Sequence, residues 1–244
     1  MVIAMILAGG YGKRLRPLTL EIPKPLVKVG DKAVIEYQIE WLKYYGIDEI
    51  VVLAGYLKEK IIEHLGSGLK YGVSITYVVE DEPLGTGGAL KNASSIIKRS
   101  ETVVIVNGDV ITNLDPIKLV EDVESREVVA TIAAVPLRSP YGILSINEDK
   151  RLIVDFKEKP VLHEYWINGG VYAFKSDIIE YLPEYGDIEK TAFPELAARG
   201  LLGVIKYNTP PYYWKSIDTH KDLEEAAKEL QAIGGLLGSL PGRS

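Results

Sequence analysis

The chain has 244 residues, of which 47% are hydrophobic and 25% are charged, so it can bury one large α/β core and is neither disordered nor fibrous. A formal net charge of -6 argues against a protein that binds nucleic acid through a broad positive surface. Because cysteine is absent, disulfides, thiolate nucleophiles and cysteine-ligated zinc are excluded. The chain has only 3 histidines, and no two are spaced as metal ligands on one helix, so a bound metal ion would need oxygen ligands.

Short apolar runs alternate with amphipathic segments through the first half of the chain. The pattern predicts strands at 2–7, 49–53, 73–79 and 102–106, and helices at 33–45, 56–65 and 89–97. A further helix is expected from Pro116 through Val123, with Asp115 as its N-cap. Apolar strands separated by helices indicate a Rossmann-like, mostly parallel mixed sheet with helices on both faces. The first run is much shorter than the ~20 residues needed to cross a bilayer, and we expect a cytoplasmic protein without a membrane partner.

The second half has several strands and few helices. Strands are predicted at 128–136, 142–146, 152–157, 167–174 and 201–207, and helices at 187–199 and 219–233. This succession indicates an antiparallel subregion built on the parallel core. No linker or repeat divides the chain, so we expect one domain over 1–233 and a disordered, glycine-rich tail at 234–244.

The first strand runs directly into the segment Leu7-Ala8-Gly9-Gly10-Tyr11-Gly12-Lys13-Arg14-Leu15-Arg16-Pro17-Leu18-Thr19. Its glycines allow backbone N–H groups to approach an anion closely, and three cations follow within five residues. The segment therefore predicts a phosphate site at the carboxyl end of the first strand, the place where open α/β sheets bind ligands. It is not a P-loop, and Leu15 stands where the dinucleotide-binding pattern has its third glycine. The alternative is a tight turn with solvated basic residues.

This segment, followed by Pro23-Lys24-Pro25-Leu26-Val27, resembles the signature of the sugar-nucleotide pyrophosphorylases, or sugar-1-phosphate nucleotidyltransferases. Further along, Pro83-Leu84-Gly85-Thr86-Gly87-Gly88-Ala89-Leu90 resembles the nucleoside-binding loop of that family. Asn107-Gly108-Asp109 resembles its metal-binding turn, and Phe156-Lys157-Glu158-Lys159-Pro160 its sugar-phosphate motif. The resemblance covers residues 7 to 223 and implies a short member without the β-helix domain of longer relatives. It also implies a nucleotide-binding part at about 1–125 and a sugar-binding part at about 126–218.

The reaction that the resemblance implies joins a sugar 1-phosphate to a nucleoside triphosphate and releases pyrophosphate. Two polyanions must meet, so catalysis requires positioning and charge neutralisation and no covalent nucleophile. The resemblance implies catalytic contacts of Arg14 with the β- and γ-phosphates and of Lys24 with the α-phosphate. It also implies nucleotide contacts from the two glycine-rich loops and from Glu80, which lies three residues before the second loop. The residues are Leu7, Ala8, Gly9, Gly10, Gly12, Lys13, Glu80, Pro83, Gly85 and Thr86.

Two aspartates are the candidate ligands of Mg²⁺, the expected cofactor. Asp109 follows an apolar strand, so its carboxylate is expected to face the triphosphate, although it could instead cap the next turn. The second ligand departs from the family form Trp-x-Asp-x-Gly-Thr, because the chain has Trp214-Lys215-Ser216-Ile217-Asp218-Thr219. Residues two apart in an extended segment face the same side, so Asp218 can replace a carboxylate at Ser216. The alternative role of Asp218 is the N-cap of the helix at 219–233.

The resemblance also assigns sugar-phosphate contacts. Tyr141, Gly142 and Asn168 are expected to meet the sugar, Glu158 to accept hydrogen bonds from its hydroxyls, and Lys159 to bind its phosphate. The alternative for Lys157-Glu158-Lys159 is a charged strand end beside a turn.

Glu80 occupies a position that faces the nucleobase in the family. A carboxylate only accepts hydrogen bonds, which suits the adjacent N1–H and amino donors of guanine and disfavours uracil and thymine. We therefore favour GTP, and with it mannose 1-phosphate. Thymidylyl-, uridylyl- and cytidylyltransferases remain alternatives, because Asp directly before Thr resembles some cytidylyltransferases.

Two other classes of protein fit less well. A nucleotide-sugar-dependent glycosyltransferase usually has Asp-x-Asp at the end of a central strand, whereas Asn107 occupies the first position here. A non-catalytic regulatory homologue would be expected to lose Arg14, Lys24 or Asp109, and all are present. The expected partners are the nucleoside triphosphate and the sugar 1-phosphate, with no nucleic acid, and self-association into a homo-oligomer is left open.

Overall fold

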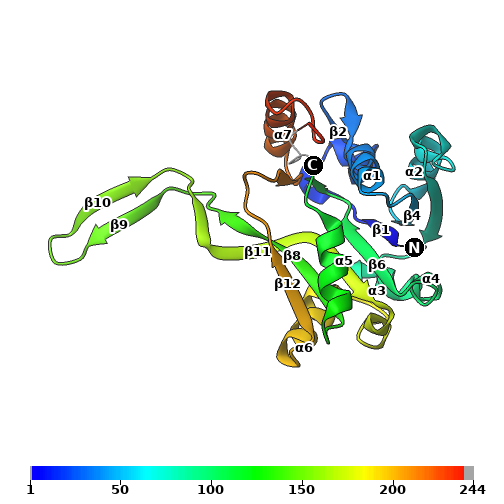
Figure 1. Ribbon diagram of the computed structural model, residues 1–244. Helices are drawn as coiled ribbons and strands as arrows, with labels where there is room; N and C mark the ends of the chain where they lie inside the picture. The colour runs from blue at the N-terminus through cyan, green and yellow to red at the C-terminus, as the bar shows by residue number, and fades with distance from the viewer. Residues whose placement is uncertain (1, 239–244) are drawn as a thin grey trace.

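The computed structural model describes residues 2–238 and is built on a seven-stranded sheet in the order β12-β8-β11-β6-β1-β4-β5 (Figure 1). Strand β11 is antiparallel to both of its neighbours, and the other neighbouring pairs are parallel. The predicted Rossmann-like, mostly parallel α/β fold is therefore confirmed. The strands of this sheet are β1 (Ile3–Ala8), β4 (Glu49–Ala54), β5 (Ser74–Val79), β6 (Thr102–Asn107), β8 (Ala130–Arg138), β11 (Val161–Lys175) and β12 (Leu202–Lys206).

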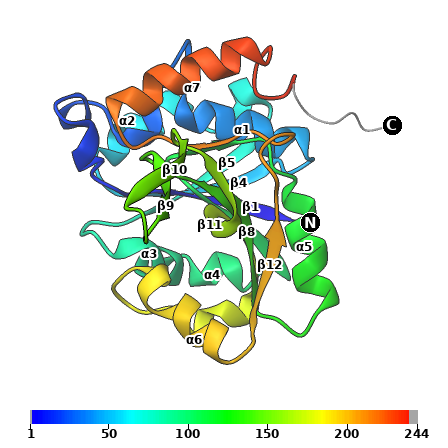
Figure 2. The same ribbon diagram turned by 90° about the vertical axis from the view of Figure 1, so that its left-hand side faces the viewer.

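Helices cover both faces of the sheet (Figure 2). One face packs against α1 (Val34–Tyr44), α2 (Lys58–Leu65), α5 (Pro116–Ser125) and α7 (His220–Ala232), and the other against α3 (Gly85–Asn92), α4 (Ser94–Ile97) and α6 (Ala192–Ala198). Because side chains alternate along a strand, Ala4 and Ile6 of β1 enter the first core layer while Met5 enters the second. A strand buried on both sides explains why the sequence reads as a continuous apolar run.

Three smaller antiparallel pairs complete the fold. Strands β2 (Lys28–Val29) and β3 (Lys32–Ala33) form a short hairpin, and β7 (Val110–Thr112) pairs with β13 (Trp214–Ser216). Strands β9 (Ile143–Asn147) and β10 (Leu152–Lys157) form a ribbon that projects from the body (Figure 1). The antiparallel character predicted for the second half is confirmed in this ribbon and in β11. Among residues 2–238, no helix has both the length and the apolar character required to span a bilayer.

Two predicted helices differ from the structure. The helix expected at 89–97 is divided into α3 and α4 and begins already at Gly85, because the Gly186 carbonyl accepts hydrogen bonds from Gly87 N at 2.9 Å and Gly88 N at 3.2 Å. The helix expected at 187–199 begins as a 3-10 turn at Ile188–Lys190 and continues as α6 after Thr191, whose backbone is not helical. The contact with Gly186 thus accounts for the early start of α3, the non-helical angles of Ala93 separate α3 from α4, and those of Thr191 separate the 3-10 turn from α6.

The predicted disordered tail is wrong for the part that the structure describes. Leu236 is 4% exposed and packs in the first core layer. The Leu236 carbonyl also accepts a hydrogen bond from Asn113 Nδ2 at 3.3 Å. An apolar side chain that finds a core contact orders residues 234–238, whereas 239–244 lie outside the described residues.

Candidate active site

A cavity of about 380 Å³ opens at the carboxyl ends of β1, β5 and β6. The carboxyl ends of parallel strands lie along one edge of a sheet, so loops that are distant in sequence meet there. None of the five predicted sugar-phosphate residues lines the cavity. All of the residues predicted for catalysis, nucleotide binding and metal binding line it: Leu7, Ala8, Gly9, Gly10, Gly12, Lys13, Arg14, Lys24, Glu80, Pro83, Gly85, Thr86, Asp109 and Asp218.

The loop after β1 forms a tight, internally held turn. Gly12 has a φ of 60°, and a Cβ there would approach Thr19 Cγ2 to 3.0 Å and Lys24 Cβ to 3.1 Å, so glycine is required. The buried Thr19 hydroxyl donates a hydrogen bond to the Gly12 carbonyl at 2.8 Å. Leu15, which is fully buried, anchors the other end of the turn. The neighbouring Lys13 and Arg14 are thereby left at the mouth of the cavity.

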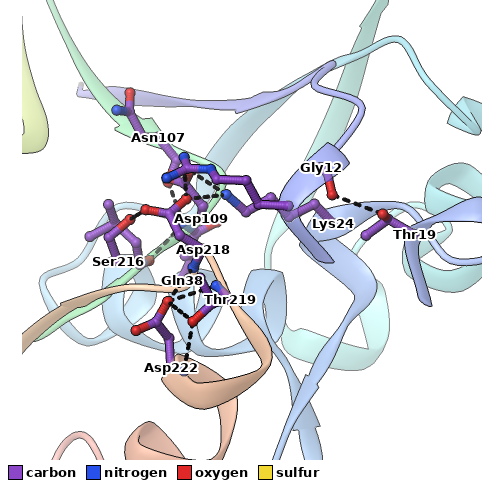
Figure 3. Close-up of polar contacts among 12 residues, drawn as sticks. Gly12, Thr19, Lys24, Gln38, Asn107, Asp109, Ser216, Asp218, Thr219 and Asp222 are labelled. Atoms are coloured by element: carbon purple, nitrogen blue, oxygen red, sulfur yellow. Dashed lines mark hydrogen bonds and ion pairs between the residues drawn. The ribbon is translucent and has the colours of Figure 1, made fainter. Parts of the chain in front are cut away.

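The pairing of β7 with β13 brings the two predicted metal ligands together. Ser216 lies opposite Val110, and Ile217 N donates a hydrogen bond to the Asp109 carbonyl at 2.8 Å. Asp218 follows this pair directly, so its carboxylate comes to lie beside that of Asp109 (Figure 3). Two carboxylates that are remote in sequence therefore reach one point at the cavity edge.

Lys24 connects these two carboxylates. Its ammonium group donates to Asp109 Oδ2 at 2.7 Å and to Asp218 Oδ1 at 2.9 Å (Figure 3). Arg14 Nη2 lies 2.7 Å from the same Asp218 oxygen, although its side chain is 70% exposed. Burial by itself would raise the pKa of Asp218, but the hydrogen bond and charge of Lys24, with smaller effects of Ser216 and Arg14, lower it below its usual value. Asp218 is therefore held ionised.

The structure excludes the N-cap role that the sequence left open for Asp218. Helix α7 is capped by Thr219, whose hydroxyl accepts a hydrogen bond from Asp222 N at 3.3 Å. The Asp222 carboxylate in turn accepts from Thr219 N at 2.7 Å, which completes a capping box (Figure 3). Asp218 therefore remains available for the cavity.

Gln38 holds the turn that presents Asp109, a role that the sequence analysis missed. Its Nε2 donates to the carbonyls of Asn107 and Val110, both at 2.8 Å, and these two residues flank the turn. Gln38 is only 1% exposed, and its Oε1 has no hydrogen-bond partner among the described residues. The sequence signal was a polar residue on the apolar stripe of the helix at 33–45. Gln38 is a positioning residue for Asp109.

Glu80 lies against two glycines. A Cβ on Gly9 or on Gly55, which follows β4, would collide with the Glu80 carboxylate. Its Oε2 accepts a long hydrogen bond of 3.4 Å from Leu84 N. Burial raises the pKa of Glu80, and the Leu84 N–H and the charge of Lys58 only partly oppose this effect. The carboxylate that was expected to face the nucleobase therefore sits in a partly dehydrated part of the cavity.

Asp187 lines the cavity, although no local sequence motif predicted it as a site residue. The segment before it packs on the start of α3, since Gly186 N donates to the Leu84 carbonyl at 2.8 Å. Thr86, also in the cavity lining, donates its hydroxyl to Glu189 Oε2 at 2.7 Å. Asp187 pairs with Lys190 at 2.7 Å. The glycines of the second glycine-rich loop are thus partly explained by the close packing of this loop against residues 183–190.

Four of the predicted sugar-phosphate residues lie together at the base of the β9–β10 ribbon, outside the cavity lining. Tyr141 is 76% exposed, and Gly142 lies next to Glu158, because a Cβ there would come within 3.0 Å of Glu158 Oε2. Lys159 Nζ is 3.5 Å from Glu158 Oε1. The grouping agrees with the sequence pattern, and the sugar role of these residues stays a prediction.

Asn168 lies in an irregular part of β11, where the pairing with β8 shifts register. Its side chain holds that irregularity, accepting from Gly170 N at 2.8 Å and donating to the Tyr172 hydroxyl at 2.9 Å. A Cβ on Gly170 would come within 3.0 Å of Asn107 Nδ2, and Asn107 lines the cavity. Asn168 itself does not line the cavity, whereas Gly170 of the same irregular segment lies against Asn107, which does.

The residues at the cavity edge fit a magnesium ion. Mg²⁺ in proteins takes one or two carboxylates and completes its shell with water and phosphate oxygens. Asp109 and Asp218 provide two carboxylates, and the described residues contain no cluster of three acidic or histidine ligands that would suit an all-protein cage. The ammonium group of Lys24 between the two carboxylates shows that this point attracts a cation.

Comparison with known proteins connects this arrangement to a described family. Residues 3–233 match the family model described as nucleotidyl transferase. The chain is 39% identical over 226 residues to a mannose-1-phosphate guanyltransferase of Yarrowia lipolytica, covering 89% of this chain and 61% of that protein. It therefore spans about three fifths of the length of that relative.

Two further similarities cover nearly the whole of the compared protein. The chain is 37% identical over 233 residues to a D-glycero-alpha-D-manno-heptose 1-phosphate guanylyltransferase of Aneurinibacillus thermoaerophilus, covering 93% of this chain and 98% of that protein. The crystal structure of HddC from Yersinia pseudotuberculosis, complexed with GMP-PN, superposes with a TM-score of 0.72 at 29% identity, covering 94% of this chain and 99% of the other.

Proposed function

Because the chain belongs to the nucleotidyl transferase family, we propose that it transfers a nucleotidyl group from GTP to mannose 1-phosphate, giving GDP-mannose and pyrophosphate. The observation that carries the proposal is the cavity at the strand ends, where the glycine-rich loop, Arg14 and Lys24 face the carboxylates of Asp109 and Asp218. Cations and carboxylates around one cavity suit a reaction between two phosphate groups. Since the reaction consumes a nucleoside triphosphate, we place it in the cytoplasm.

The two cations have separate tasks. Arg14 lies at the open mouth of the cavity, and its planar guanidinium group can bind two oxygens of the β- and γ-phosphates at once. Lys24 is only 13% exposed and lies deeper, where its ammonium group would neutralise charge on the α-phosphate as the sugar phosphate attacks in line. Both cations are paired with Asp218 in this structure, so binding of the triphosphate exchanges these ion pairs for phosphate contacts.

Asp109 and Asp218 would hold Mg²⁺. The ion supplies positive charge to the phosphate oxygens and helps to orient the triphosphate. Gln38 keeps the turn of Asp109 in place, and the Ser216 hydroxyl donates to Asp218 Oδ2 at 3.0 Å, which orients the second carboxylate. The protein therefore holds the turn of Asp109 through its backbone and one oxygen of the Asp218 carboxylate through Ser216.

Glu80 supports guanine as the base. Its carboxylate is a hydrogen-bond acceptor in the cavity wall. Guanine presents two adjacent donors to such a group, whereas uracil presents one donor between two carbonyls. The two named relatives are guanylyltransferases, and both names specify a manno-configured sugar 1-phosphate. These names support GTP and mannose 1-phosphate as the substrates of this chain.

The proposal is tested by measuring pyrophosphate release from GTP, CTP, UTP, dTTP and ATP, each combined with a panel of sugar 1-phosphates. We expect the highest kcat/KM with GTP and mannose 1-phosphate. Fastest release with UTP, dTTP or CTP would retain the transferase reaction and refute the assignment of the base. No release with any pair, from a chain shown to be folded by circular dichroism, would refute the transferase function itself.

A further inference from the structure

The order of the strands gives the two ends of the cavity different surroundings. Along this part of the sheet the order is β11-β6-β1-β4-β5. Glu80 follows β5, the first glycine-rich loop follows β1, and the turn with Asp109 follows β6. A nucleoside triphosphate with its base at Glu80 and its phosphates at the glycine-rich loop would extend from β5 toward β6. The space that remains for the sugar 1-phosphate then lies over β6 and β11.

The part of β11 at this end of the cavity is the segment Asn168-Gly169-Gly170. Since β11 runs antiparallel to β6 and Val171 lies opposite Val106, Gly170 comes to lie beside Asn107. Gly170 has a φ of 68°, in the left-handed region, and the pairing with β8 shifts register between Asn168 and Tyr172. Such an irregularity disrupts the ladder of backbone hydrogen bonds, so other contacts must hold the segment.

Three side-chain contacts hold this segment. Asn168 Oδ1 accepts from Gly170 N at 2.8 Å, and Trp214 Nε1 of β13 donates to the Gly169 carbonyl at 2.6 Å. Asn168 Nδ2 donates to the Tyr172 hydroxyl at 2.9 Å. The segment is therefore held by Trp214 from the strand that leads to the second metal ligand, and by Tyr172 from the core of the protein.

The core fixes the position of Tyr172. Its side chain is fully buried, and its ring centroid lies 5.6 Å from that of Phe174 and 5.1 Å from that of Phe193. A phenylalanine would fill the same place in this aromatic cluster, so the packing of the rings does not require the hydroxyl. The hydroxyl instead serves polar groups on the cavity side.

The hydroxyl of Tyr172 joins two polar side chains at this end of the cavity. Burial and the charge of Glu189 raise the pKa of Tyr172, and hydrogen bonds from the amides of Asn168 and Asn107 oppose this rise only in part, so the hydroxyl stays protonated. Asn107 lines the cavity. Building on the transferase function proposed above, we propose that this hydroxyl holds Asn168 and Asn107 in place for the sugar 1-phosphate. Tyr172 is then a positioning residue for that substrate and not for GTP.

The test replaces Tyr172 by phenylalanine and measures initial rates of pyrophosphate release, with each of the two substrates that the wild type uses best varied in turn. The change removes one oxygen and keeps the aromatic ring. A displacement of ~1 Å in a positioning group can cost ~100-fold in rate, so we expect the KM for the sugar 1-phosphate to rise at least ~10-fold. The KM for GTP should stay within about twofold of the wild type. A residue that only stabilises the fold would not separate the two KM values.

Tyr207→Phe is the matched control. Tyr207 is 1% exposed, and its hydroxyl donates to the carbonyl of Asp115, the N-cap of α5, outside the cavity lining. This variant should keep both KM values of the wild type. A readout without turnover is the hydrogen exchange of the Gly170 amide, followed by NMR. We expect this exchange to accelerate at least ~10-fold in Tyr172→Phe and to stay unchanged in Tyr207→Phe.

Several outcomes would overturn the proposal. Tyr172→Phe could leave both KM values and the exchange of the Gly170 amide unchanged, or it could raise both KM values alike. Tyr207→Phe could raise the KM for the sugar 1-phosphate by the same factor. Circular dichroism verifies folding, and a Tyr172→Phe chain that does not fold would show that the hydroxyl serves the core. A wild type without turnover refutes the transferase function itself, whereas an active wild type with any of these outcomes refutes the positioning role alone.

Discussion

Replacing Gln38 by leucine tests whether this buried amide positions Asp109. The change removes the donor that serves the carbonyls of Asn107 and Val110, while the volume of the side chain is nearly kept. Each of the two carbonyls left without this donor costs ~1–3 kcal/mol, and the change also removes the unpaired Oε1 of Gln38, which offsets about one such cost. We therefore expect a net loss of about 1–3 kcal/mol in the free energy of unfolding, measured by urea denaturation.

The same change should act on the metal site beyond its effect on stability. A turn that has lost both hydrogen bonds can displace the Asp109 carboxylate, and a displacement of ~1 Å at a reacting centre can cost ~100-fold in rate. We expect the Mg²⁺ concentration for half-maximal pyrophosphate release to rise at least ~10-fold. A second readout without turnover is the rise in melting temperature on adding Mg²⁺ and GTP, which should shrink in the variant.

Tyr37→Phe is the matched control for this experiment. Tyr37 lies next to Gln38 on α1 and donates to the Val29 carbonyl at 2.8 Å, away from the cavity. This variant should lose about 1 kcal/mol of stability and keep the Mg²⁺ dependence of the wild type. If Gln38→Leu is destabilised and its Mg²⁺ titration coincides with that of Tyr37→Phe, Gln38 is a structural residue only and the positioning role is refuted.

Other substitutions probe the remaining groups of the cavity. Asp109→Asn should keep the fold and lower turnover by at least ~100-fold, and near-normal turnover would remove Asp109 from the reaction. Glu80→Gln should weaken the use of GTP and improve that of UTP or dTTP, because an amide both donates and accepts; unchanged kcat/KM ratios would contradict the guanine contact. Asp218→Ala should raise the Mg²⁺ requirement, whereas Ser216→Ala, which removes no carboxylate, should change it less. Because the folded-state pKa of Asp218 is lowered, its stabilising contribution is complete above the unfolded-state pKa and is lost as pH falls through the folded-state value. Urea titrations in that acidic range should therefore show a steeper loss of stability for the wild type than for Asp218→Asn, and equal pH profiles would argue against the ion pair with Lys24.

Elements that have a local cause were predictable from residue types and their spacing alone. The first strand was predictable because a strand buried on both faces needs a continuous apolar run. The loop from Gly9 to Lys13 was predictable because a phosphate-binding loop needs adjacent glycines and cations. Asp115 was likewise predicted as an N-cap, and its carboxylate accepts from Ile117 N at 3.0 Å as expected. Residue type and spacing along the chain suffice for such features.

The way in which remote segments meet depends on tertiary contacts. The sequence left Asp218 between a metal ligand and a helix cap, and the pairing of β7 with β13 brings it to Asp109 while Thr219 caps α7. Asp187 enters the cavity through a loop packed on α3, and Glu158 lies outside the cavity at the base of the projecting ribbon. Contacts between distant segments depend on strand pairing and loop packing, which local hydrophobic periodicity does not encode, because the same pattern is compatible with several registers and neighbours.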